Sequence, residues 1–156
     1  MNSLKKIDYI SGWIKEYATT LSFQPVSLVI GVSGGIDSAV TSTLCAKTGF
    51  KTIAISMPIK QNSNQHDLSL KHLDWLKKNF DNVETKIIEL DRVFESFENT
   101  MQDFNNSLAF ANSRSRLRMV TLYQIAQANR GIVVGTGNKV EDFGVGFYTK
   151  YGDGGV

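Results

Sequence analysis

The chain has 156 residues, enough for one domain with a substantial core. Hydrophobic residues make up 42% and charged residues 21%, and the formal net charge of +2 is too small to indicate a nucleic-acid or membrane partner. The first residues lack an apolar signal region, and no apolar run approaches the length of a membrane span. The single cysteine, Cys45, cannot form an internal disulfide, so we expect a small core residue in a reducing cytoplasm.

Hydrophobic periodicity predicts helices and strands in regular alternation. Helices are expected at 4–21, 38–47, 66–80 and 107–129. A further helix is expected to be capped by Asp91, with Phe94, Phe97, Met101 and Phe104 facing inward. Strands are expected at 26–32, 52–57, 83–90 and 132–134. Gly49 and Gly131 are expected to cap the helices before them, and the residues from Gly135 onward to form a loop.

This alternation predicts an α/β fold, a doubly wound parallel sheet with helices on both faces. Ligands bind such sheets beyond the carboxyl ends of the strands. Three polar clusters follow strand ends, at 33–38, 57–67 and 135–153. We therefore expect the three clusters to converge on one ligand site. The histidines, His66 and His72, do not have metal-ligand spacing and are expected at the surface.

The segment Ser33-Gly34-Gly35-Ile36-Asp37-Ser38 lies between the first predicted strand and the helix after it. Glycines in this position let the backbone approach an anion, and the start of the helix directs N–H groups and a partial positive charge at it. A carboxylate beside an anion is explained by a divalent cation between them, so Asp37 indicates Mg²⁺. No Gly-Lys-Ser or Gly-Lys-Thr occurs, which excludes the usual NTPase lysine.

A second group of candidate ligands follows the last predicted strand. In the run Gly135-Thr136-Gly137-Asn138-Lys139-Val140-Glu141-Asp142, the Thr136 hydroxyl can bind a nucleotide and Glu141 can be the second Mg²⁺ carboxylate. The aromatic residues and lysine of 146–155 suit stacking and contacts with phosphate or carboxylate. The glycine-rich stretch 144–155 and the polar stretch 60–65 are candidate lids.

The first motif resembles that of the PP-loop ATP pyrophosphatases, which split ATP between its α- and β-phosphates. The segments Gly-Thr-Gly-Asn-Lys-x-Glu and Phe-Tyr-Thr-Lys-Tyr-Gly-Asp-Gly-Gly resemble ammonia-dependent NAD⁺ synthetases more specifically, as does the run from Asn112 to Met119. The resemblance covers essentially the whole chain. It implies an adenine-nucleotide hydrolase-like, Rossmann-like domain over 1–156 without a glutaminase domain. Members of that family continue past the point matching Val156, so a C-terminally incomplete, poorly stable and inactive chain is expected.

The resemblance implies a role for individual residues. ATP would be held by Gly31, Val32, Ser33, Gly34, Gly35, Ile36, Asp37, Ser38 and Thr136. Deamido-NAD⁺ would be contacted by Arg116, Lys150, Asp153, Asn112 and Tyr123. Mg²⁺ would be held by Asp37 and Glu141. No side chain would act as nucleophile, and charge would be stabilised by Ser33, Asp37, Ser38 and Lys150.

Helical geometry bears on the arginines of this set. Arg114 and Arg118 share one face of the predicted helix and Arg116 lies on another, so only one or two should touch the same ligand. Tyr123 lies seven residues after Arg116, which lets both line one groove.

The implied reaction amidates deamido-NAD⁺ with free ammonia through an adenylated intermediate, giving NAD⁺, AMP and pyrophosphate. A homodimer is implied by the same resemblance. Two other readings stay open at this point. One is another PP-loop enzyme, such as a GMP synthetase-like amidating enzyme or a tRNA-modifying enzyme. The other is a nucleotide-binding fragment without catalysis.

Overall fold

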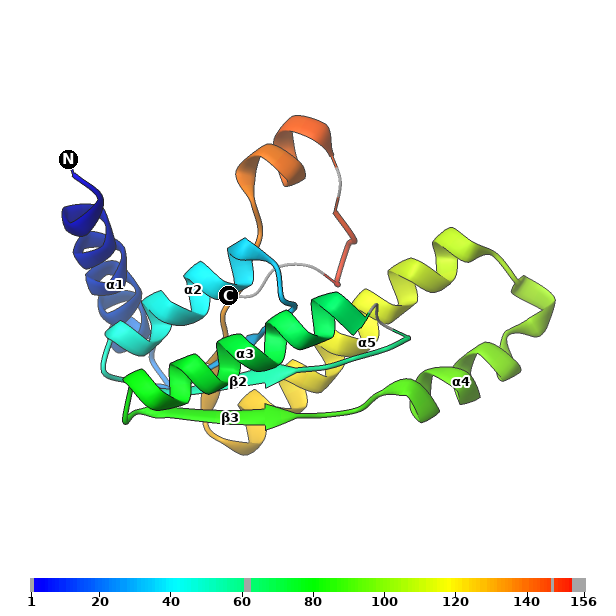
Figure 1. Ribbon diagram of the computed structural model, residues 1–156, viewed down its shortest axis with the longest axis horizontal. Helices are drawn as coiled ribbons and strands as arrows, with labels where there is room; N and C mark the ends of the chain where they lie inside the picture. Colours follow the sequence, from blue (N-terminus) through cyan, green and yellow to red (C-terminus); the bar gives the residue numbers. More distant parts are fainter. Residues whose placement is uncertain (1, 61–62, 147, 153–156) are drawn as a thin grey trace.

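The computed structural model describes residues 2–60, 63–146 and 148–152 (Figure 1). The α-helices are α1 (Ser3–Thr20), α2 (Ile36–Lys47), α3 (Ser63–Asn79), α4 (Asp91–Thr100) and α5 (Ser107–Ala128). The strands are β1 (Ser27–Gly31), β2 (Lys51–Ser56), β3 (Val83–Ile87) and β4 (Gly131–Val133). Two short segments complete the structure, the 3₁₀ turn η1 (Gln102–Phe104) and the π-helical η2 (Val140–Val145).

The four strands form one parallel sheet in the order β3-β2-β1-β4. Ser27 pairs with Lys51 on one side and with Gly131 on the other, so three strands start level and end at the same edge. The sheet order places the first strand between β2 and β4, where the connections change direction. The expected parallel α/β sheet is confirmed, and the segments after β1, β2 and β4 leave from its carboxyl edge.

Alternating side chains of β1 divide the core into two layers. Leu28 and Ile30 pack on one face with residues of α1, α2 and α3. Val29 packs on the other face with residues of α4 and α5. Cys45 is fully buried in the first layer, as expected, and burial raises the pKa of its thiol to about 12. Helices therefore cover both faces, and α1 and α4 lie at opposite ends of the long axis (Figure 1).

Element boundaries differ from the expectation around α4. The third strand ends at Ile87 instead of residue 90, although the Ile88 N–H still donates to Ser56 O at 2.9 Å. Leu90 is the N-cap of α4, and no side chain caps that end. Asp91 does not cap the helix. Its carboxylate accepts a hydrogen bond from the backbone N–H of Lys60 at 2.6 Å and so holds the segment after β2.

The buried face of α4 extends over fewer residues than the spacing of its aromatic residues predicted. Phe94 is 1% exposed, whereas Phe104 is 77% exposed because the chain has already turned into η1. The helical phase therefore breaks after Met101, and the expectation that Phe104 faces inward is wrong. Phe110 of α5 packs edge-on against Phe94 in its place, with ring centroids 6.2 Å apart.

The end of α5 also differs from the expectation. Arg130, with φ of +49°, adopts the left-handed conformation expected for Gly131. Gly131 instead begins β4, where an added Cβ would lie 2.8 Å from the carbonyl oxygen of Ser27. Close approach of two strands, not helix termination, requires this glycine. The predicted cap at Gly49 is confirmed in conformation, with φ of +83° directly after α2.

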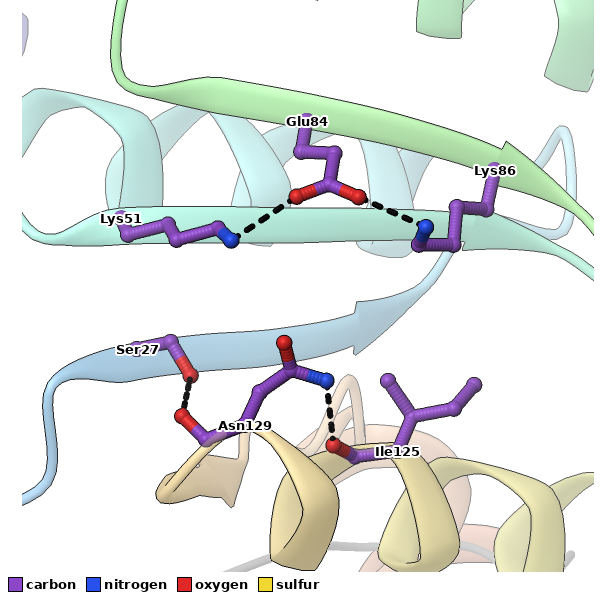
Figure 2. A network of polar contacts seen from close by, with 6 residues as sticks. All are labelled: Ser27, Lys51, Glu84, Lys86, Ile125 and Asn129. Carbon is purple, nitrogen blue, oxygen red and sulfur yellow. Dashed lines mark hydrogen bonds and ion pairs between the residues drawn. The ribbon is translucent and has the colours of Figure 1, made fainter.

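Polar contacts link the edge strand β3 to β2 and hold the end of α5 beside β1 (Figure 2). Glu84 on the edge strand β3 bridges Lys51 at 2.9 Å and Lys86 at 2.6 Å. Beneath them, the Ser27 hydroxyl donates to Asn129 O at 3.0 Å, which fixes the α5 C-terminus beside β1. Charged side chains on an edge strand also disfavour pairing with another chain.

The histidines are less exposed than expected. His72 is half-buried, with its Nε2 2.9 Å from the Ser42 hydroxyl, and burial lowers the pKa of its imidazole. His66 is also half-buried, at the start of α3. Within the described residues, no helix is both long and apolar enough to cross a bilayer.

Candidate nucleotide site

The glycine-rich turn joins β1 to α2 at the carboxyl edge of the sheet. Gly34 has φ of +90°, and a Cβ there would overlap the carbonyl oxygen of Gln65. Only glycine satisfies both constraints. Gly35 is the N-cap of α2, and no side chain makes a capping hydrogen bond to the first N–H groups of this helix.

Two serine hydroxyls fix the shape of this turn. The Ser33 N–H donates to Ser38 Oγ at 3.1 Å, and Ser38 Oγ donates to Gly35 O at 3.0 Å. The two hydroxyl oxygens, Ser33 Oγ and Ser38 Oγ, lie 3.1 Å apart. Ser38 is buried while Ser33 is exposed, so one anchors the turn and the other faces the open side. The turn is thus preorganised.

A cavity of about 540 Å³ opens beside the turn. Its walls come from the turn, the segment after β2, the inner face of α5 and the segment after β4. Of the residues expected to hold ATP, it is lined by Gly31, Val32, Ser33, Gly35, Ser38 and Thr136. Gly34 instead faces α3, and the Ile36 side chain points to solvent and is 74% exposed. The three polar clusters converge here, since Lys60 and Gln65 also line the cavity.

A smaller adjoining cavity of about 200 Å³ brings the candidate metal ligands together. Asp37, in the first turn of α2, lines it with Glu141 and Asp142 of η2. Ser33, Ser38 and Thr136 border both cavities. Across the described ranges, no three acidic, histidine or cysteine side chains converge closely enough for a metal site of protein ligands alone.

The segment that carries Glu141 was expected to be a loop but is π-helical. The Asn138 carbonyl accepts from the Asp142 N–H at 2.8 Å, and the Asn138 side chain accepts from the Val140 N–H at 2.9 Å. Gly146, with φ of +75°, ends the segment. Its apolar residues are exposed, which explains why hydrophobic periodicity did not predict a helix; they are Val140, Phe143 and Val145.

Side chains of α5 bind the segment 148–152. Asn112 Oδ1 accepts from the Thr149 hydroxyl at 2.9 Å, and the Ser115 hydroxyl donates to Gly152 O at 2.9 Å. Arg116 Nε donates to Lys150 O at 3.1 Å. Three of the expected deamido-NAD⁺ contacts, Asn112, Arg116 and Lys150, are therefore adjacent in space.

Neither Tyr123 nor Arg116 lines either cavity. Tyr123 is 47% exposed, and Arg116, although it holds the segment 148–152, is also exposed. The face of α5 toward the larger cavity instead presents Ser115, Arg118, Met119 and Leu122. Asp153 lies outside the described residues.

Sequence reasoning missed Arg118. Its Nε donates to Met57 O at 2.9 Å, and burial is the main cause that lowers the pKa of its guanidinium, followed by the nearby charge of Arg114. A signal was present, because Arg118 lies four and eight residues before the buried Leu122 and Ala126 on one helical face.

A parallel sheet covered by helices on both faces, with a preorganised glycine-rich turn at the end of β1 and carboxylates beside it, defines an α/β domain of the doubly wound class. Residues 6–156 match the protein-family model described as NAD synthase. The chain belongs to that family.

Relatives and solved structures agree with this assignment. The NH(3)-dependent NAD(+) synthetase of Mesoplasma florum is 37% identical over 96% of this chain and 60% of its own length. The structure titled NMN synthetase from Francisella tularensis superposes with a TM-score of 0.85 at 33% identity, covering 98% of this chain and 61% of that one. NH3-dependent NAD synthetase from Campylobacter jejuni gives 0.85 at 30% identity, over 98% and 64%. The chain thus spans about three-fifths of these relatives' length.

Proposed function

We propose that the protein amidates deamido-NAD⁺ with ammonia at the expense of ATP, giving NAD⁺, AMP and pyrophosphate. The observation that carries the proposal is the shared cavity of Asp37 and Glu141, two carboxylates from distant parts of the chain, at the glycine-rich turn. That arrangement suits a polyphosphate with a divalent cation, and family membership supplies the reaction class.

ATP binding is assigned to the larger cavity. The backbone N–H groups at the start of α2 would bind the outer phosphates, aided by the helix dipole and by the exposed Ser33 hydroxyl. Thr136 borders both cavities and would donate its hydroxyl to the nucleotide. The turn needs little reorganisation, because Ser33 and Ser38 already fix its backbone.

The residues present fit Mg²⁺. Asp37 and Glu141 offer hard carboxylate oxygens, and Mg²⁺ is usually held by one or two carboxylates together with substrate phosphates. When bound there, Mg²⁺ would supply charge neutralisation for the departing pyrophosphate. Phosphate oxygens and water would complete the coordination.

The chemistry needs no nucleophilic side chain. The nicotinate carboxylate attacks the α-phosphorus and pyrophosphate leaves; ammonia then attacks the acyl carbon and AMP leaves. The chain's contribution would be positioning and stabilisation of negative charge. The segment 148–152, held by Asn112, Ser115 and Arg116, would help exclude water from the adenylate. The proposed deamido-NAD⁺ contacts remain Arg116, Lys150, Asn112, Tyr123 and Asp153.

The decisive experiment supplies the purified full-length protein with deamido-NAD⁺, ATP, Mg²⁺ and ammonium. NAD⁺ and AMP are expected in equal amounts, with no ADP, because cleavage falls between the α- and β-phosphates. Formation of ADP, or AMP release that does not require the dinucleotide, would contradict the proposal. A glutamine-supplied reaction is the control, and we expect it to be inactive without added ammonium.

A second candidate is amidation of the corresponding mononucleotide. It is favoured by the close superposition on the Francisella tularensis structure, whose title names an NMN synthetase. Both candidates use the same ATP chemistry and differ in the adenylyl half of the acceptor. Comparing kcat/KM for deamido-NAD⁺ and its mononucleotide distinguishes them, and we expect the dinucleotide to be preferred. A homodimer in the cytoplasm is part of the same proposal, tested by solution mass and cell fractionation.

A further inference from the structure

Arg118 is a half-buried cation on the wall of the larger cavity. It projects from the face of α5 that carries Leu122, and its Nε donates to Met57 O, just beyond the end of β2. One of the five guanidinium N–H groups is thereby used and the planar group is fixed. The remaining donors are on the two terminal nitrogens.

The charge of Arg118 has no partner within the described part of the chain. No carboxylate there lies within ion-pair distance, and the terminal nitrogens make no hydrogen bond. The charges that act on it are Arg114, which repels it, and Asp91, which attracts it less strongly. Arginine does not lose its proton in proteins, so this cation stays charged although burial disfavours it. A desolvated charge of this kind is costly unless an anion pairs with it.

The other cation on this wall is already paired. Among the described lining residues, only Lys60 and Arg118 are basic. Lys60 Nζ lies 2.6 Å from Glu98 Oε2, whereas the glycine-rich turn itself carries no basic side chain. A nucleotide in this cavity would therefore meet backbone N–H groups at the turn and, among the described lining residues, a single uncompensated positive charge on the α5 wall.

We propose that Arg118 contacts the ribose-linked phosphate of the bound nucleotide. This assignment rests on the proposed function, which places the outer phosphates at the glycine-rich turn. Arg118 approaches from α5, on a different wall, so it is suited to the phosphate that the turn does not enclose. That phosphate carries the phosphorus at which the reaction occurs. The planar fork of arginine suits two phosphate oxygens, and its anchor on Met57 reduces the entropy lost on binding.

The test compares adenosine with AMP as probes in Arg118→Gln, by calorimetry or ligand-observed NMR. The two probes differ only in the phosphate. We expect AMP to bind about tenfold to a hundredfold more weakly than to the wild type, and adenosine to bind unchanged. The matched control is Arg114→Gln, one turn earlier on the same helix, whose guanidinium lies 5.5 Å from the Phe94 ring centroid and outside the cavity. It should leave both affinities unchanged.

Equal weakening of adenosine and AMP in Arg118→Gln would overturn the assignment, because it would show that Arg118 only supports the wall through Met57. If that variant does not fold, Arg118→Lys decides: retained charge should preserve part or all of the AMP advantage over adenosine, and a complete loss of that advantage would refute the phosphate contact. Failure of the wild type to bind either probe would instead refute the nucleotide site itself. The two failures are therefore distinguishable.

Discussion

The Thr149 hydroxyl donates to the Asn112 side-chain oxygen at 2.9 Å, which ties the C-terminal part of the described chain to the first half of α5. Asn112 was expected to contact deamido-NAD⁺. In the structure its oxygen is used to hold a segment that borders the cavity, since Gly152 lies in the cavity wall. Its contribution to dinucleotide binding can therefore be made through that segment.

This contact predicts a selective effect on the acceptor substrate. Thr149→Val removes the donated hydrogen bond, and we expect KM for deamido-NAD⁺ to rise about threefold to tenfold with a smaller change for ATP, as for one neutral hydrogen bond. Thr149→Ser keeps a hydroxyl and is the control, with KM close to the wild type. Steady-state kinetics with each substrate varied separately provides the measurement. An equal rise in both KM values would show general loosening of the site.

The paired carboxylates predict a second effect. Asp37→Asn and Glu141→Gln each remove a proposed metal-binding charge, so turnover should fall by about a hundredfold or more and the Mg²⁺ concentration for half-maximal rate should rise. Thermal unfolding without ligand should be little changed, because neither carboxylate makes an ion pair in the described structure. Asp103→Asn, on the exposed turn η1, is the matched control. Unaltered Mg²⁺ dependence in both site variants would contradict the assignment.

Glu84 predicts a pH dependence of stability. Hydrogen bonds from Lys86 and then Lys51 lower the pKa of its carboxyl from near 4.5 to about 2. Since the folded pKa is the lower one, the stabilisation is present above pH 4.5 and is lost as pH falls toward 2. Both ion pairs of Glu84 are partly exposed, so we expect Glu84→Gln to lower the free energy of unfolding at pH 7 by about 1 kcal/mol or less. Urea titrations at pH 7 and near pH 2 should show the difference only at pH 7, and high salt should reduce it.

Cys45 predicts slow chemical labelling. Its thiol is fully buried, and burial raises its pKa to about 12, so almost no thiolate exists at pH 8. A thiol reagent should react only when the protein unfolds, with a rate that rises in urea. Rapid stoichiometric labelling of the native protein would contradict the buried placement.

The aromatic residues of α4 and η1 predict contrasting effects on stability. Phe94→Ala removes a ring that is 1% exposed and should lower the free energy of unfolding by about 3–5 kcal/mol. Phe104→Ala removes a ring that is 77% exposed and should change it by less than about 0.5 kcal/mol. Equilibrium denaturation of the two variants side by side gives the comparison, and similar losses would place Phe104 in a core.

Much of the fold could be predicted because buried positions recur along the sequence as apolar residues with the spacing of a strand or a helix. The run Leu28, Val29, Ile30 is apolar on both sides and therefore belongs in a parallel sheet with two covered faces. The glycine-rich turn could be located because its conformation demands glycine at position 34. The convergence of the segments after β1, β2 and β4 followed from parallel topology alone.

The other features of the fold and of the site depend on contacts between distant residues, and these cannot be predicted from a single sequence. Arg130 adopts a conformation usually taken by glycine because Gly131 is required against Ser27, and a residue-by-residue reading assigns the cap to the wrong position. The orientation of α5 is decided by packing, which turns Arg118 inward and leaves Tyr123 half-exposed. The π-helical segment around Glu141 could not be predicted from hydrophobic periodicity, because its apolar residues are exposed.

The absence of a side chain at Gly34 has a mechanical consequence. Because its backbone rests directly against the carbonyl of Gln65, the glycine-rich turn and the first turn of α3 touch backbone to backbone, with no side chain between them at this point. Displacement of one must displace the other, so an anion that tightens the turn also restrains a helix that packs on β2 and β3.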